Sequence, residues 1–141
     1  MIPTPSQTVG PFFGFGLQPV DGGGDMRIEG QVLDGSADPV SDALLEISDD
    51  QQFARCRTDE EGAFAFAVAR PAVGFLVLTV FARGLLRHLT TRVYLPEAAD
   101  AVPEEVEPAR RHTLLARLEG EVFRFDVRLQ GRDETVFFAP T

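Results

Sequence analysis

The sequence has few of the side chains from which catalytic and metal sites are usually built. It contains no lysine and no tryptophan, and only one cysteine (Cys56), one tyrosine (Tyr94) and two histidines (His88 and His112). A single cysteine excludes an intrachain disulfide framework and a cysteine-based zinc site. The sequence also has no HxH, HxxxH or CxxC spacing for a metal and no GxSxG elbow for a nucleophilic serine. We therefore expect no catalytic residues and no metal site that this chain could complete alone.

The charge balance of the chain is acidic. All 13 basic residues are arginine, and 22 acidic residues bring the formal net charge to −9. Clustered lysine and arginine supply most of the affinity for nucleic acid, so we expect no nucleic-acid partner. The longest apolar stretch without a charge, residues 71–82, is too short to span a bilayer. No basic segment followed by an apolar run opens the sequence, so we expect a cytoplasmic protein with no membrane partner.

The composition predicts one folded domain preceded by an irregular arm. With 44% hydrophobic and 25% charged residues, the chain can form an ordinary core. Residues 1–25 mix prolines and glycines with phenylalanines, which leaves neither helix nor strand periodicity. A disordered tail is normally poor in aromatic residues. We therefore expect residues 1–25 to dock on the domain itself or, as we favour, on a partner subunit, and residues 26–141 to form the domain.

From residue 26 onward the pattern is that of short β-strands separated by turns. Ile28, Gly30 and Val32 alternate with polar neighbours, as in a half-buried strand. Gly62 ends the polar turn 58–62, where it can adopt a positive φ. The other expected strands are 43–48, 53–57 at a sheet edge, 63–68 inside a sheet, 75–81, 85–95, and the hairpin strands 112–118 and 122–129. The proline-punctuated stretch from Pro96 to Pro108 can hold at most a short helix, and the tail 134–138 is apolar enough to pair or pack.

Seven or eight short strands with regular turns and little helix predict an all-β protein built as a β-sandwich. The spacing Gly30-x-Val32-x-Asp34, followed later by Gly62-x-Phe64-x-Phe66, is typical of small sandwiches of the prealbumin or transthyretin type. Many carriers and adhesive modules share this architecture, so the fold alone says little about function.

Three segments of the sequence resemble the intradiol ring-cleavage dioxygenases, and specifically their α subunits. The arm 4–12 (TPSQTVGPF) is similar to the family's N-terminal TPSQTxGP motif. Residues 79–94 (TVFARGLLRHLTTRVY) resemble its FARG…HLxTRxY stretch, and residues 124–138 (RFDVRLQGRDETVFF) match its C-terminal ending. The three segments occur in the family's order, and the likeness covers nearly the whole domain.

The resemblance implies an enzyme subunit that contains no iron itself. In this family a β subunit holds a non-haem Fe(III) through two tyrosines and two histidines. It uses O2 to cleave 3,4-dihydroxybenzoate between its hydroxylated carbons, which gives 3-carboxy-cis,cis-muconate in the β-ketoadipate pathway of aromatic catabolism. Catalytic chains have an HxH pair on the strand where this sequence has Phe75 and Val77. The count of one tyrosine agrees, because two tyrosine ligands cannot come from Tyr94 alone.

The resemblance also implies which residues of this chain meet the substrate, a small aromatic acid, at the boundary between the subunits. They are Thr8, Gly10, Pro11 and Phe12 of the arm and Arg83 of the FARG segment. The arm would form part of the wall of the β subunit's pocket, and the Arg83 guanidinium would attract the substrate's carboxylate. A plainer interpretation of Arg83, as a surface arginine paired with one of many carboxylates, stays open.

A second function remains compatible with the sequence. A stand-alone transthyretin-like binding module without enzyme activity would have the same strand pattern. The features that favour the subunit are the aromatic arm and Arg83, for which a simple carrier has no need. We interpret His88, His112, Tyr94 and Cys56 as structural or solvated residues, because no activating neighbours accompany them in the sequence.

Overall fold

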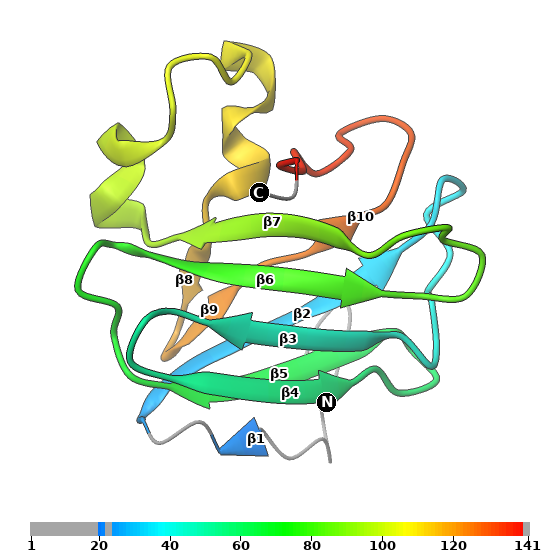
Figure 1. The fold of residues 1–141 in the computed structure, drawn as a ribbon, viewed down its shortest axis with the longest axis horizontal. Coiled ribbons are helices and arrows are strands. Elements are labelled where there is room, and N and C mark those ends of the chain that lie inside the picture. Colours follow the sequence, from blue (N-terminus) through cyan, green and yellow to red (C-terminus); the bar gives the residue numbers. More distant parts are fainter. Residues whose placement is uncertain (1–19, 22–23, 140–141) are drawn as a thin grey trace.

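The computed structural model describes residues 20–21 and 24–139, and it is an all-β sandwich (Figure 1). This confirms the predicted fold class. Two sheets pack face to face, and the few helical turns lie at one end of the sandwich. Among the described residues, no helix has the length and apolar character needed to cross a membrane.

The first sheet is built around one long strand. This strand, β2 (Met26–Leu33), pairs antiparallel with β5 (Ala63–Val68) and parallel with β9 (Val122–Arg124) and β10 (Val127–Arg128). At one edge, β1 (Val20–Asp21) pairs parallel with β5, and at the other edge β8 (Arg117–Glu119) pairs antiparallel with β9. β5 is buried along nearly its whole length, as expected for a strand inside a sheet.

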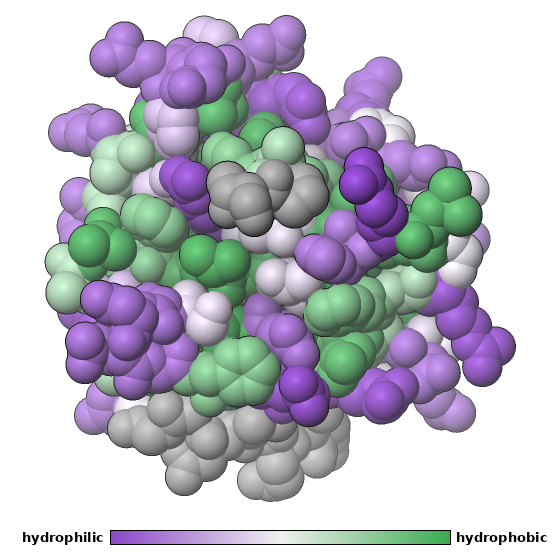
Figure 2. Space-filling model, viewed as in Figure 1, coloured by the Kyte–Doolittle hydropathy of each residue, from purple (hydrophilic) through white to green (hydrophobic). Residues whose placement is uncertain are grey.

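The second sheet has four antiparallel strands in the order β4-β3-β6-β7. They are β4 (Phe53–Arg57), β3 (Leu44–Ser48), β6 (Phe75–Phe81) and β7 (Leu89–Tyr94). The outer face of this sheet mixes apolar and polar side chains (Figure 2), among them the exposed Phe53 and the ion pair of Arg55 with Glu46. β4 lies at the sheet edge, which confirms that expectation.

The core lies between the sheets and follows from the alternation of apolar residues. In β2 and β6 every second side chain is buried, because successive side chains of a strand point to opposite faces. The buried residues Ile28, Phe66, Leu45 and Leu78 meet in one cluster drawn from both sheets. Gly62 adopts φ +73 in the turn before β5, as the sequence predicted.

Three expected strands have different bounds in the structure. The strand expected at 85–95 begins only at Leu89, because Gly84 has φ +85 and residues 82–88 form a turn. The strand expected at 112–118 is wrong in its first half, since the 3₁₀ helix η2 (Pro108–Leu114) continues through it. The strand expected at 122–129 is interrupted at Phe125–Asp126, so that β9 and β10 pair with two separate parts of β2.

The C-terminal tail closes the β7 edge of the second sheet. Phe138 N donates to Thr90 O at 2.7 Å, and Thr91 Oγ1 donates to Val136 O at 2.8 Å. With η2 and the segment that joins it to the 3₁₀ helix η1 (Pro96–Ala101), the tail packs over a second apolar cluster that contains Tyr94, Val102 and Val106. The structure thus confirms that the tail pairs and packs, and that the proline-rich stretch holds only short helical turns.

Candidate functional site

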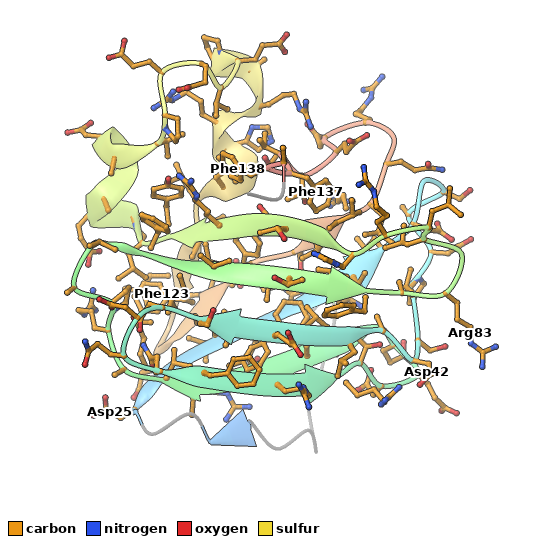
Figure 3. The ribbon with its side chains drawn as sticks, viewed as in Figure 1. Asp25, Asp42, Arg83, Phe123, Phe137 and Phe138 are labelled. Atoms are coloured by element: carbon orange, nitrogen blue, oxygen red, sulfur yellow. The ribbon has the colours of Figure 1, made fainter. Side chains whose placement is uncertain are left out.

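Arg83 lies in the turn that follows β6, and its side chain points away from the body of the protein (Figure 3). The side chain is 89% exposed, and its Nε lies 3.8 Å from Asp42 Oδ2. Asp42 already accepts a hydrogen bond from Arg57 Nη1 at 2.8 Å through its other oxygen. An exposed ion pair of this length contributes little to stability. The Arg83 guanidinium is therefore available to a second anion.

The turn that holds Arg83 and the end of β6 before it expose apolar side chains. Leu86 is fully exposed, and Phe81 is 37% exposed beside the ring of His88, with the two ring centres 5.2 Å apart. Apolar side chains gathered on an exposed turn are a feature of surfaces that contact another molecule. A guanidinium flanked by such side chains would be partly desolvated if a partner covered the turn, and its attraction for a carboxylate would then be stronger.

The predicted arm residues cannot be placed beside Arg83. Thr8, Gly10, Pro11 and Phe12 lie outside the described residues, so the structure neither brings them together with Arg83 nor separates them. The end of the arm that is described pairs with the domain itself, since Val20 and Asp21 pair parallel with β5. The division into an arm, 1–25, and a domain, 26–141, stays a prediction.

Phe75 and Val77, where the resemblance places the histidine ligands of catalytic chains, do not fit an iron ion. Phe75 and Val77 have only carbon in their side chains. The neighbouring strand places Arg92 opposite Val77, and the Arg92 guanidinium carbon lies 5.0 Å from the centre of the Phe75 ring. Arg92 Nη1 also donates to Tyr94 Oη at 3.0 Å. A guanidinium cation beside the buried phenol would repel a metal cation, so these residues are unsuited to hold ferric iron.

The rest of the described chain likewise lacks a candidate metal site. It contains no group of three or more histidine, cysteine, aspartate or glutamate side chains that could hold a metal ion. Cys56 is buried, and this burial raises the pKa of its thiol above the usual value. A buried neutral thiol is a poor nucleophile.

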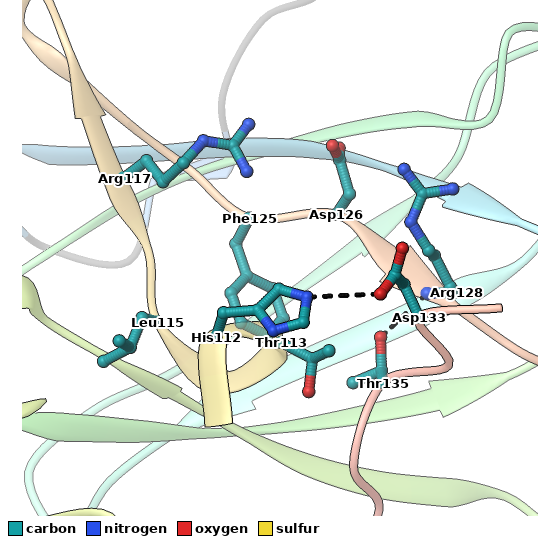
Figure 4. Close-up of a pocket in the computed structure, with 9 residues that line it drawn as sticks. All are labelled: His112, Thr113, Leu115, Arg117, Phe125, Asp126, Arg128, Asp133 and Thr135. Atoms are coloured by element: carbon teal, nitrogen blue, oxygen red, sulfur yellow. Dashed lines mark hydrogen bonds and ion pairs between the residues drawn. The ribbon is translucent and has the colours of Figure 1, made fainter. Parts of the chain in front are cut away.

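The structure contains a polar pocket that the sequence did not indicate. It has a volume of about 180 Å³ and opens between η2, β8, β10 and the loop before the tail (Figure 4). Its lining residues are His112, Thr113, Leu115, Arg117, Phe125, Asp126, Arg128, Asp133 and Thr135. They come from three separate stretches of the chain, 112–117, 125–128 and 133–135, so no single local motif could have revealed the pocket. It includes neither Arg83 nor Asp42.

Solved structures identify the class of fold. The dioxygenase domain of a dioxygenase–carbohydrate-binding fusion protein from Streptomyces sp. SirexAA-E superimposes with a TM-score of 0.60 at 20% identity, covering 86% of this chain and 94% of that chain. Hydroxyquinol 1,2-dioxygenase from Pseudomonas putida DLL-E4 gives a TM-score of 0.59 at 20% identity, covering 84% of this chain and 63% of that one. An intradiol ring-cleavage dioxygenase from Tetranychus urticae also matches, with a TM-score of 0.55 at 12% identity over 84% of this chain and 90% of that chain. The fold is that of the intradiol dioxygenases.

Curated sequences identify the family more narrowly. The chain is 36% identical to the protocatechuate 3,4-dioxygenase alpha chain of Burkholderia cepacia, with 96% of each sequence covered. It is 30% identical to the alpha chain of the same name from Pseudomonas putida, covering 96% of this chain and 95% of that one. No family model matches the chain. The chain belongs to the family of protocatechuate 3,4-dioxygenase alpha chains.

Proposed function

We propose that this chain is the non-catalytic α subunit of a cytoplasmic protocatechuate 3,4-dioxygenase. An iron-bearing β subunit would cleave 3,4-dihydroxybenzoate between its two hydroxylated carbons, and both atoms of O2 would enter the product, 3-carboxy-cis,cis-muconate. The observation that supports this most is the likeness, over 96% of the chain, to a curated protocatechuate 3,4-dioxygenase alpha chain. The hydrocarbon side chains of Phe75 and Val77 cannot bind a metal, which supports the proposal that the partner subunit holds the iron.

The contribution of this chain would be to complete the wall of the substrate pocket on the β subunit. Thr8, Gly10, Pro11 and Phe12 would supply part of that wall, with Gly10 allowing the backbone to approach the substrate closely. Arg83 would supply a positive charge at the subunit boundary. Its exposure of 89% and its long contact with Asp42 support this role, since no described residue holds the guanidinium in a buried network or a close ion pair.

A positive charge at the subunit boundary would help to attract an anionic substrate. The chain has a formal net charge of −9, and an anionic aromatic acid would be repelled by such a surface. A guanidinium can bind a carboxylate through two parallel hydrogen bonds, which both attracts and orients it. The iron chemistry itself would need no side chain from this subunit.

Co-expression with a β chain tests the proposal. The genes for this chain and for a longer homologue with HxH and two ligand tyrosines are expressed together and separately. We expect one hetero-oligomer on size-exclusion chromatography, with iron in proportion to the β chain and O2 uptake on 3,4-dihydroxybenzoate. This chain alone should show neither iron nor O2 uptake. Failure to co-assemble, with this chain remaining a stable monomer in both preparations, would favour the stand-alone transthyretin-like binding module.

A further inference from the structure

The polar pocket contains a buried hydroxyl group whose proton has no acceptor in the described part of the chain. Thr135 is 1% exposed, and its Oγ1 accepts a hydrogen bond from the Arg128 amide at 2.8 Å. Within residues 20–21 and 24–139, no hydrogen bond in which the Thr135 hydroxyl donates is found. A buried donor without an acceptor costs about 1–3 kcal/mol, so native structures rarely keep one without a reason. A bound acceptor in the pocket would satisfy it.

The charged side chains around the pocket leave positive charge unpaired. The Asp126 carboxylate accepts hydrogen bonds from Arg124 and from the Gln31 amide, and Asp133 lies 3.5 Å from His112 Nε2. Both carboxylates of the pocket therefore already have partners.

The two arginines of the pocket are less well satisfied. Among the described residues, the Arg117 guanidinium forms an ion pair with Glu119 alone, at 3.3 Å, and its side chain is 62% exposed. For the Arg128 guanidinium, the described part of the structure contains no hydrogen bond or ion pair. In Figure 4 the two cations stand on either side of Asp126, whose carboxylate is already bonded to Arg124 and the Gln31 amide. The Arg128 guanidinium and the Thr135 hydroxyl are thus donors without an acceptor among the described residues, and Arg117 adds a cation held only by an exposed ion pair.

The volume and the apolar lining of the pocket restrict the size and chemistry of a ligand that could bind there. Drug-sized ligands occupy pockets of roughly 300 Å³ or more, so about 180 Å³ admits only a compact molecule. The lining includes the apolar side chains of Leu115 and Phe125, which could contact a small apolar body. Guanidinium groups favour planar carboxylates, which accept two parallel hydrogen bonds.

We propose that this pocket binds a small monocarboxylate with a compact apolar body. Its carboxylate would bind the Arg128 guanidinium and accept the Thr135 hydroxyl proton, with Arg117 adding positive charge across the opening. Its apolar part would lie against Leu115 and Phe125. This site is separate from the proposed role of Arg83, because none of its residues comes from the turn after β6.

An NMR titration of the full-length chain tests this site. The 15N-labelled chain is titrated with sodium benzoate, sodium acetate and sodium phosphate at constant ionic strength, and the backbone amides of Arg128 and Thr135 are followed. We expect saturable shifts at both amides with benzoate, a weaker response to acetate, and none with phosphate at the same concentrations. Shifts that increase linearly without saturation, or phosphate binding as tightly as benzoate, would overturn the proposal.

Matched substitutions show whether the named side chains bind the acid. Arg128→Gln should weaken benzoate binding at least tenfold, whereas Arg87→Gln, which removes the same charge from an exposed arginine outside the pocket, should change it less than twofold. Equal effects of the two substitutions would mean that benzoate is held only by the general positive charge of the surface, which would contradict the proposed site. Arg128→Gln should leave co-assembly and O2 uptake with the β chain unchanged. The pocket proposal can therefore be contradicted while the proposed function of the chain still holds.

Discussion

The guanidinium carbon of Arg92 lies 4.3 Å from the centre of the Phe138 ring and 5.0 Å from that of Phe75. Arg92 is in β7, Phe75 is in the neighbouring strand β6, and Phe138 is in the C-terminal tail. One cation is thus held between two aromatic rings that are 63 positions apart in the sequence. This contact joins the tail to the second sheet, in addition to the backbone hydrogen bond between Phe138 and Thr90.

Removing this cation should loosen the tail. Arg92→Met keeps a long apolar side chain but removes both the charge over the rings and the donor to Tyr94 Oη. Cation–π contacts contribute about 0.5–2 kcal/mol, and a lost hydrogen bond about 1 kcal/mol, so we expect a loss of roughly 1–3 kcal/mol. Urea denaturation measures it, with Arg87→Met as the control at an exposed site. No difference between the two variants would show that the contact does not stabilise the tail.

Thr58 supplies a second internal connection, and its hydroxyl can be tested with matched variants. Its Oγ1 accepts from the Ala43 amide at 2.8 Å and donates to Val40 O at 2.9 Å. Thr58→Val removes the hydroxyl and leaves the buried Ala43 amide and the half-buried Val40 carbonyl without this partner, which should cost about 1–3 kcal/mol. Thr58→Ser keeps the hydroxyl and should cost clearly less. A serine variant as unstable as the valine variant would mean that packing, rather than hydrogen bonding, is decisive at this position.

Gly30 should tolerate no side chain. A Cβ atom at this position would lie 1.7 Å from the carbonyl oxygen of Phe125 and 2.6 Å from its carbonyl carbon, both in the backbone. Backbone atoms cannot give way as the end of a side chain can, so Gly30→Ala should destabilise the protein by about 3 kcal/mol or more. Gly120→Asn is the control, because nothing lies within 4 Å of a Cβ there and asparagine accepts the positive φ of 66. Thermal melts of both variants measure the difference, and a Gly30→Ala protein with unchanged Tm would contradict the packing described.

The buried thiol of Cys56 should make stability depend on pH in the alkaline range. Burial raises its pKa in the folded protein, so the unfolded chain loses this proton at a lower pH than the folded chain. Above the unfolded pKa, the unfolded state therefore binds fewer protons, and stability falls as the pH rises toward the folded pKa. Cys56→Ala lacks this contribution, so its stability should fall less between pH 7.5 and pH 10 than that of the wild type. Urea denaturation under reducing conditions measures both, and an equal fall in both would contradict the assignment.

The strand pattern was predictable because it depends on local alternation. The buried positions Phe123, Phe125 and Val127 lie on one face, as their spacing indicated, even though the backbone interrupts the strand at Phe125 and Asp126. That interruption was not predictable, because it arises from tertiary contacts. The Phe125 amide donates to Glu29 O, and the Asp126 carboxylate accepts from the Gln31 amide. Both residues therefore form hydrogen bonds with β2, which is distant in the sequence.

The candidate sites were predictable only where a contiguous motif marks them. Arg83 follows from the resemblance of one segment to a known family, and the structure shows it exposed at the end of β6. The polar pocket has no such signal. Arg117, Arg128 and Thr135 are brought together by the hairpin and by the return of the tail, and only the folded chain shows their proximity.

The charge of Arg83 is the feature whose loss should be visible in catalysis. In the assembled α–β enzyme, Arg83→Ala should lower kcat/KM for 3,4-dihydroxybenzoate roughly ten- to a hundredfold. A charge-assisted hydrogen bond contributes about 1.5–3 kcal/mol, and about 1.4 kcal/mol corresponds to a factor of ten. Arg87→Ala, which removes a neighbouring exposed arginine from the same chain, should leave kcat/KM nearly unchanged.

The most direct measurement compares two substrates on the Arg83→Ala enzyme, with iron content and assembly checked in each preparation. Catechol has no carboxylate, so its kcat/KM should change much less than that of 3,4-dihydroxybenzoate. This difference is the result that the proposed role of Arg83 at the subunit boundary predicts. An equal loss for both substrates would instead indicate disturbed assembly, and no loss for either would contradict the role of Arg83 in binding the substrate's carboxylate.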